Sequence, residues 1–175
     1  MTLYPTAMGA AFGGLPDALQ RFHTVEGRYT GRVRVSHGNG LARTIARAGG
    51  MPGTAGEMPF SFRLTHTKDA EVWERDFGGH ITRSTQWLHA PGIVAERVGS
   101  SVFLMAPEVR DEGLFIPITG VRGFGLPVPQ GLVVSCEGME RVRDDGAVTF
   151  DVHARVRALG LIIRYQGTMT RSDDA

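Results

Sequence analysis

The residues with the greatest capacity for chemistry lie close together in one stretch, VWERDFGGHITRSTQWLH, which holds both tryptophans of the chain. Arg75 stands two residues from an aromatic side chain on either side, with Trp73 before it and Phe77 after it. A guanidinium between two rings can stack on them or bind an anionic group. His80 and Trp87 follow in the same stretch. These five residues are therefore candidates for a ligand-binding site.

The glycine pair Gly78-Gly79 predicts that this stretch is a β-hairpin. It separates two runs rich in β-branched and aromatic residues, and both central positions of a tight hairpin turn need positive φ. A two-residue turn here pairs Phe77 with His80 and Arg75 with Thr82. A shift of one residue would exchange all these partners, so the assignment depends on the turn.

Side chains alternate along a strand, so the hairpin has two faces of different composition. If the face of Arg75 points inward, the guanidinium must meet a carboxylate or a bound anion, because an unpaired buried charge costs several kcal/mol. If it points outward, the stem of Arg75 lies across the rings and its head is in water. The pattern leaves both orientations open. One face carries Trp73, Arg75, Phe77, His80, Thr82 and Ser84, and the other carries Val72, Glu74, Asp76, Ile81, Arg83, Thr85 and Trp87.

Glu96, in the next predicted strand, is the candidate carboxylate partner. It shares a strand face with Val94 and Val98, whereas Arg97 belongs to the opposite face, and the pattern does not decide which of the two charges points inward. An inward carboxylate in apolar surroundings could serve as an acid or base, or anchor a ligand. The alternative is an ion pair with Arg75 at a strand end.

Length, charge and cysteine content exclude several classes of protein. The 175 residues suit a single domain, residues 1–175, and the net charge of +1 from 19 basic and 18 acidic residues argues against a nucleic-acid-binding surface. Cys136 is the only cysteine, so an internal disulfide is impossible and we expect a reducing, cytoplasmic location. No apolar run is long enough to span a membrane.

Known metal and cofactor motifs are missing from the chain. The six histidines lack metal-binding spacing, and neither a nucleophile elbow nor a Walker sequence occurs. A turn of the type Gly-Asn-Gly at residues 38–40 resembles a dinucleotide-binding loop but lacks the third glycine, whose place Arg43 holds. We therefore expect neither a metal nor a cofactor.

Hydrophobic periodicity divides the chain into three parts. Residues 1–23 read as short helices, residues 25–57 as a first strand followed by a short helix, and residues 58–171 as an antiparallel meander. In the second part, Asn39 is a suitable N-cap for a helix whose apolar side carries Leu41, Ala42, Ile45 and Ala46. The predicted fold class is α+β: a strongly curved antiparallel sheet or incomplete barrel of about 7–9 strands, with short N-terminal helices packed on it.

Several segments together resemble the bacterial domain of unknown function 4166, in the same order and over nearly the whole chain. They are LYPTAMGAAFGGLPDALQRFH, GRVRVSHGNGLARTIARAGGMP, WERDFGG, ERVGS and FDVHARVRALGLIIRYQGTM. That family is often fused behind a saccharopine-dehydrogenase-like or other nicotinamide-dependent oxidoreductase domain, and no known function comes with the resemblance. It places in the family's positions Trp73, Arg75, Phe77, Gly78, Gly79, Glu96, Arg97 and Gly99.

Three functions remain open. The first is a non-catalytic module that binds an apolar or amphipathic small molecule in a concave pocket. The second is a cofactor-free isomerase or cyclase that uses a pocket carboxylate or histidine as acid or base. The third is a docking module for a separately encoded oxidoreductase. For the first, the predicted walls are Trp73, Phe77 and Trp87, and the predicted polar contacts are Arg75, His80 and Glu96.

Overall fold

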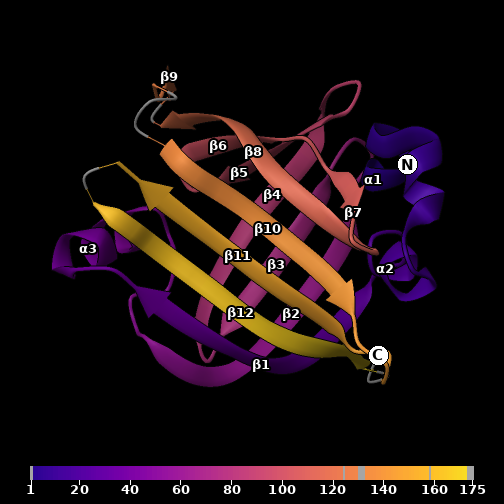
Figure 1. Cartoon of the computed structure of the whole chain (residues 1–175), viewed down its shortest axis with the longest axis horizontal. Coiled ribbons are helices and arrows are strands. Elements are labelled where there is room, and N and C mark those ends of the chain that lie inside the picture. The colour runs from indigo at the N-terminus through magenta and orange to yellow at the C-terminus, as the bar shows by residue number, and fades with distance from the viewer. Residues whose placement is uncertain (1, 124, 130–132, 158, 173–175) are drawn as a thin grey trace.

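The computed structural model describes residues 2–123, 125–129, 133–157 and 159–172 of the chain, which form one long antiparallel sheet with short helices (Figure 1). The helical segments are α1 (Leu3–Met8), the 3-10 helix η1 (Gly9–Gly14), α2 (Asp17–Phe22) and α3 (Gly40–Ala48). The strands are β1 (Gly27–His37), β2 (Gly56–His66), β3 (Glu71–Phe77), β4 (His80–Ala90), β5 (Ile93–Val98), β6 (Ser101–Met105), β7 (Glu108–Arg110), β8 (Gly113–Gly123), β9 (Leu126–Pro127), β10 (Val133–Val142), β11 (Val148–Val156) and β12 (Gly160–Ser172).

The sheet closes into a barrel. Antiparallel pairs run from β10 through β11, β12 and β1 to β6, and β8 then pairs with both β6 and β10. Ten strands therefore complete the ring, while the short β7 and β9 attach to β8. Closure removes the two open edges, whose unpaired backbone groups would otherwise face water or another chain.

The expectation of an incomplete barrel with about 7–9 strands is wrong in this detail. The strand β8 makes the difference, because its first half pairs with β10 and its second half pairs with β6. The β8–β10 pairing joins the two ends of the sheet. The prediction of a mostly antiparallel, strongly curved sheet with short helices is confirmed.

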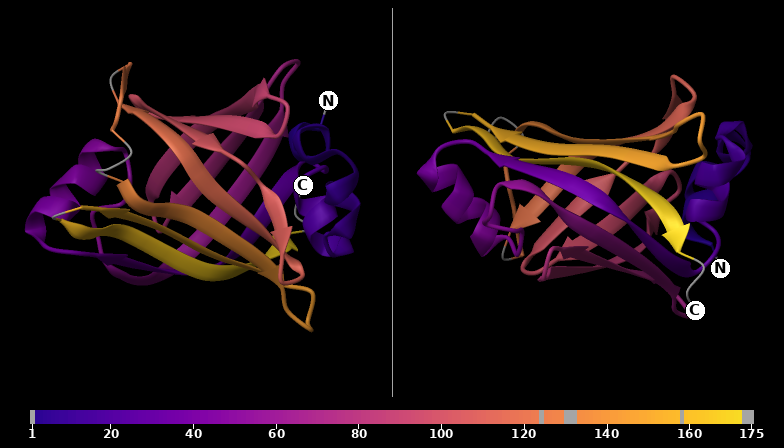
Figure 2. Two further views of the ribbon diagram at one scale, coloured as in Figure 1. Left: turned by 45° about the horizontal axis from the view of Figure 1, so that its top comes forward. Right: turned by 90° about the horizontal axis from the view of Figure 1, so that it is seen from below.

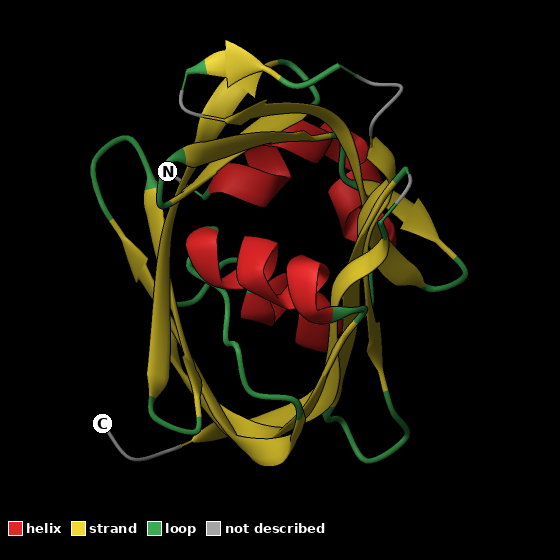
Figure 3. Cartoon of the chain, turned by 90° about the vertical axis from the view of Figure 1, so that its left-hand side faces the viewer, coloured by secondary structure: helices red, strands yellow, loops and turns green. Residues whose placement is uncertain are grey.

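Helices lie at both ends of the barrel (Figures 2 and 3). At one end, α1 lies against β4 and β5, and α2 lies against β10. At the other end, α3 packs against β12, and the Asn39 side chain accepts a hydrogen bond from the Ala42 N–H at 3.0 Å, which confirms the predicted N-cap. Ala42 and Ala46 are buried, whereas Leu41 and Ile45, expected on the same side, are exposed.

None of the helices in the described part of the chain is long and apolar enough to cross a membrane.

The central hairpin has the predicted register. Phe77 pairs with His80 and Arg75 with Thr82, and both turn glycines have positive φ, 63° at Gly78 and 101° at Gly79. Alternate residues of β3 are buried, so the face that carries Arg75 points into the barrel. The main core lies inside the barrel and is rich in aromatic side chains: Phe22, Tyr29, Phe60, Phe62, Trp73, Phe77 and Phe150.

The contact between β1 and β12 depends on two glycines. A Cβ atom at Gly31 would lie 1.9 Å from the Thr168 carbonyl oxygen, and one at Gly167 would lie 2.2 Å from the Arg32 carbonyl oxygen. Both obstacles are backbone atoms, which a rotamer change cannot move. Glycine at these two positions therefore allows β1 and β12 to approach each other closely.

We predict that Gly31→Ala destabilises the protein by about 2 kcal/mol or more, because the strand pair must separate to admit the methyl group. Gly40→Ala is the matched control, since a Cβ atom at this first residue of α3 meets nothing within 4 Å. The control should leave stability unchanged or raise it by up to about 1 kcal/mol. Urea unfolding of both variants gives the comparison, and equal midpoints would contradict the proposed role of Gly31.

Candidate functional site

An ion pair lies inside the barrel. Arg75 Nη2 donates to Glu96 Oε1 at 3.1 Å, Arg75 Nη1 donates to Ser84 Oγ at 2.9 Å, and the guanidinium carbon lies 5.0 Å from the centre of the Trp73 ring. The Arg75 and Glu96 side chains are 11% and 13% exposed. Burial acts to lower the pKa of Arg75, but the charge of Glu96 outweighs that effect and the pKa is raised. Arg75 therefore remains a cation whose charge is already matched.

Four of the six predicted site residues, Trp73, Arg75, Phe77 and Glu96, lie inside the barrel. Trp73, Arg75 and Phe77 face the interior from β3, and Glu96 does so from β5, on the far side of β4 in the sheet. Of the two charges at the end of β5, Glu96 thus points inward, and Arg97 lies outside.

The remaining two predicted residues lie elsewhere. His80 is exposed at the hairpin turn, and its Nε2 lies 3.0 Å from the Gly50 carbonyl oxygen at the α3 end of the barrel. Trp87 lies on the outer face, where the Arg97 guanidinium is 5.7 Å from its ring centre. Alternation along β4 already placed Trp87 opposite the face of Trp73, so grouping the two as walls of one pocket did not follow the strand pattern.

A second buried polar contact, between His23 and Glu140, was not predicted. His23 Nε2 lies 2.7 Å from Glu140 Oε2, and the two side chains are 0% and 8% exposed. The ring of Tyr4 lies 4.1 Å from that of His23, measured between centroids. His23 and Glu140 are 117 residues apart, and no local sequence pattern links them. Closure of the barrel and docking of α2 bring them together.

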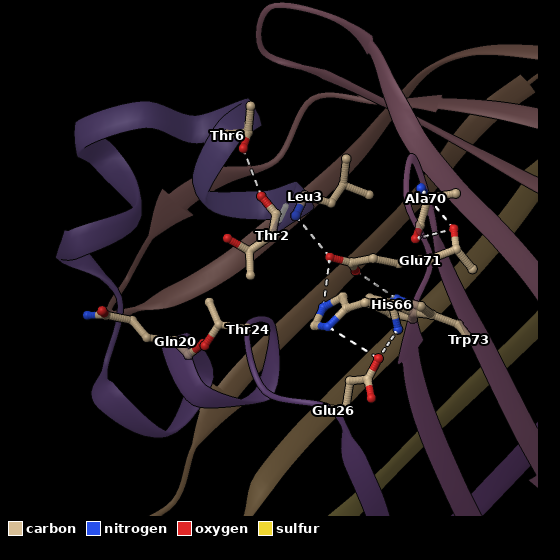
Figure 4. Close-up of polar contacts among 11 residues, drawn as sticks. Thr2, Leu3, Thr6, Gln20, Thr24, Glu26, His66, Ala70, Glu71 and Trp73 are labelled. Atoms are coloured by element: carbon tan, nitrogen blue, oxygen red, sulfur yellow. Dashed lines mark hydrogen bonds and ion pairs between the residues drawn. The ribbon is translucent and has the colours of Figure 1, made fainter.

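A third polar group ties the N-terminus to the barrel (Figure 4). Buried Glu71 accepts hydrogen bonds from the Leu3 N–H at 2.9 Å and from Trp73 Nε1 at 3.2 Å. His66 lies between two carboxylates, with Nε2 3.5 Å from Glu71 and Nδ1 3.6 Å from Glu26. These distances are too long for hydrogen bonds. Glu71 thus holds α1 over the end of the barrel.

The strand register aligns polar side chains in one row across four strands. His66 lies opposite Glu71, Glu71 opposite Gln86, and Gln86 opposite Glu96. Gln86 and Glu71 are each 1% exposed. A row of this kind is unusual inside a barrel, because buried polar groups are costly unless they find partners.

Burial and the buried carboxylates shift the pKa values of three groups on other elements. Burial raises the pKa of Tyr4, and the carboxylates of Glu140, Glu96 and Glu71 raise it further. Burial also raises the pKa of Tyr165 to about 12 and that of Cys136 to about 12, with a contribution from Glu96 in both cases. Both hydroxyls and the thiol are therefore protonated at neutral pH.

The inward side chains of the barrel differ in how exposed they are. Inward side chains of β1, β2 and β3 are buried: Tyr29, Val33, Val35, Phe60, Phe62, Leu64, Trp73 and Phe77. On β6, β8, β11 and β12 the inward side chains are mixed. Six of them are buried: Met105, Leu114, Val148, Phe150, Ile163 and Met169. Seven others keep partial exposure: Phe103, Ile116, Ile118, Val121, Val152, Ala154 and Tyr165. Phe103, for example, lies directly opposite Glu96.

A shallow groove of about 450 Å³ crosses the outer surface of β1, β12, β11 and β10. Its charged groups are largely paired with one another, since Arg34 contacts Glu57, and Asp151 binds Arg164 through both carboxylate oxygens. These exposed pairs leave few polar groups free for a ligand. In the described part of the chain, no group of three His, Cys, Asp or Glu side chains could hold a metal ion.

The sequence profile of the domain of unknown function 4166 (DUF4166) matches residues 15–169. The chain belongs to this DUF4166 family. Among solved structures, the chain is similar to that of Rv2717c from M. tuberculosis, with 14% identity over 90% of this chain and 99% of that chain and a TM-score of 0.49. No curated protein matches the chain. The DUF4166 match starts after α1, and therefore does not include Tyr4.

We predict that Glu96→Gln lowers the free energy of unfolding by about 3 kcal/mol, because it leaves the buried Arg75 guanidinium without its counter-charge. Glu74→Gln on the outer face of β3 is the control, since Glu74 pairs there with Arg83, whose side chain is 72% exposed. The control should change stability by less than about 0.5 kcal/mol. Chemical denaturation of both variants at pH 7 measures the difference. Equal effects would mean that the inner pair contributes no more than a surface pair.

Proposed function

We propose that this DUF4166 protein is a binding module that takes an apolar or amphipathic small molecule into the barrel, beside Arg75 and Glu96. The observation that carries the proposal is the partial exposure of inward apolar side chains on β6, β8 and β11. Protein interiors are close-packed and hold few voids larger than a water molecule. Partly exposed apolar side chains inside a closed ring of strands therefore support the presence of space for a ligand.

The composition of that space resembles a small-molecule site. Such sites are mostly apolar and contain a few polar groups that fix the orientation of the ligand. Here Phe103, Ile116 and Val121 provide apolar walls, and the pair of Arg75 and Glu96 provides a polar contact at partial exposure. Binding has stronger support than catalysis, because the Glu96 carboxylate is already engaged by Arg75.

The test is to fill the space from β11. Ala154 points inward between Cys136 and Ile163 and keeps partial exposure, so Ala154→Phe should occupy the space with little strain. Arg155→Phe adds the same ring at the exposed neighbouring position. The neutral dye N-phenyl-1-naphthylamine, which fluoresces in apolar surroundings, is the probe.

We expect saturable dye binding to the unmodified protein and to Arg155→Phe. Binding to Ala154→Phe should be at least about tenfold weaker, because the dye loses apolar contact area that the new ring occupies. The melting temperature of Ala154→Phe should not fall. A packed interior would give the reverse: Ala154→Phe would be destabilised by about 1–3 kcal/mol through overpacking, and the dye would not saturate any of the three proteins.

A further inference from the structure

The polar groups inside the barrel specify the chemical class of the ligand. We propose that the interior site selects molecules with a positively charged, hydrogen-bond-donating head, an alkylammonium being the simplest, and rejects carboxylates and other anions. This inference rests on the binding function proposed above. It reverses the first expectation for Arg75, which as an isolated arginine would favour an anion.

The balance of charge in the interior favours a cation. Three carboxylates, those of Glu71, Glu96 and Glu140, lie in the barrel on β3, β5 and β10 and act together on the Tyr4 hydroxyl of α1. The Arg75 guanidinium is already paired with the Glu96 carboxylate. A further carboxylate placed among these groups would lose its hydration and gain repulsion. A cation in the same place would be attracted.

Several buried polar atoms near these carboxylates lack partners. Within the residues that the structure describes, Tyr4 Oη, His23 Nδ1 and Gln86 Oε1 are buried without a hydrogen bond. Each of these residues is 1% exposed or less. Leaving such atoms unsatisfied costs about 1–3 kcal/mol each, so a bound group or water should meet them.

Two of these atoms are oxygens that can accept a hydrogen bond from a ligand. Gln86 Oε1 can only accept, and it lies in the polar row between Glu71 and Glu96. His23 faces the Glu140 carboxylate with Nε2, and its second ring nitrogen, Nδ1, has no partner. The Tyr4 hydroxyl can accept as well as donate.

The unpartnered atoms belong to the same end of the interior. The Tyr4 ring lies 4.1 Å from the His23 ring and 5.9 Å from the Trp73 ring, between centroids. Helix α1, which carries Tyr4, lies against β4 and β5, the strands of Gln86 and Glu96. An ammonium offers three donors, carries the required positive charge, and gains from the faces of Tyr4 and Trp73. A head group of this kind satisfies more of the site than any anion can.

The experiment compares three probes with the same ten-carbon chain: decylammonium, decanol and decanoate, each below its micelle concentration at pH 7. Trp87→Phe removes the outer tryptophan and leaves Trp73, inside the barrel, as the fluorescent reporter. We expect saturable changes in Trp73 fluorescence, with decylammonium binding at least about tenfold more tightly than decanoate. Decanol should lie between them.

Two further variants in the Trp87→Phe background test the cause. Glu96→Gln removes one carboxylate and frees Arg75, so the ratio of decylammonium to decanoate affinity should fall by about tenfold or more. Glu74→Gln on the outer face should leave this ratio unchanged. If Glu96→Gln does not fold, Gln86→Leu serves instead, since it removes an acceptor at constant charge and should weaken decylammonium relative to decanol.

The outcomes separate the two proposals. Saturable binding in which decanoate is as tight as decylammonium, or a ratio that both Glu96→Gln and Glu74→Gln leave unchanged, overturns the selectivity and leaves the binding function standing. The absence of a saturable change with all three probes overturns the binding function and the selectivity with it.

Discussion

The ion pair between Arg75 and Glu96 determines how the interior of this barrel can be used. It lies between β3 and β5, across β4, and Ser84 on β4 binds the same guanidinium. Two opposite charges at partial burial are stable only while both remain. The pair therefore requires the strands to stay in register, and it leaves Arg75 unable to act as a simple anion receptor. Every functional interpretation of the interior must begin from a guanidinium that is already neutralised.

Closure of the sheet gives this pair its surroundings. The pairing of β8 with β10 turns an open sheet into a ring, and helices then lie at the two ends. The inward side chains of β1, β2 and β3 are buried, while others such as Phe103 and Val121 keep partial exposure. Polar atoms of Tyr4 and Gln86 remain without partners at the end that the N-terminal helices cover. These features are the basis of the proposed interior site.

Local patterns in the sequence predicted the local parts of this structure. The Gly78-Gly79 turn fixed the hairpin register, and with it the placement of Arg75 and Trp73 on one face; Asn39 marked the start of α3. The suggested Arg75–Glu96 pair is present as well. Each of these depends on residues within one strand, one turn or two consecutive hairpins, where alternation and turn chemistry carry the information.

Features that depend on distant contacts could not be predicted in this way. Barrel closure depends on β8 pairing with β10. The contact between His23 and Glu140 depends on α2, near the N-terminus, packing against β10, more than a hundred residues later in the chain. Neither leaves a periodic signal in the sequence. Burial of Ala42 in α3 beside exposed Leu41 likewise reflects how the helix crosses β12 rather than its own apolar pattern.

A high-resolution crystal structure of the protein as purified tests the central claim, an unfilled polar interior, most directly. We predict electron density that does not belong to the chain, as ordered water or a bound molecule, between Glu96 and Phe103 and within hydrogen-bond distance of Gln86 Oε1. An interior in which Phe103, Ile116 and Val121 pack directly against the opposite strands, with no density beside Gln86, would contradict it.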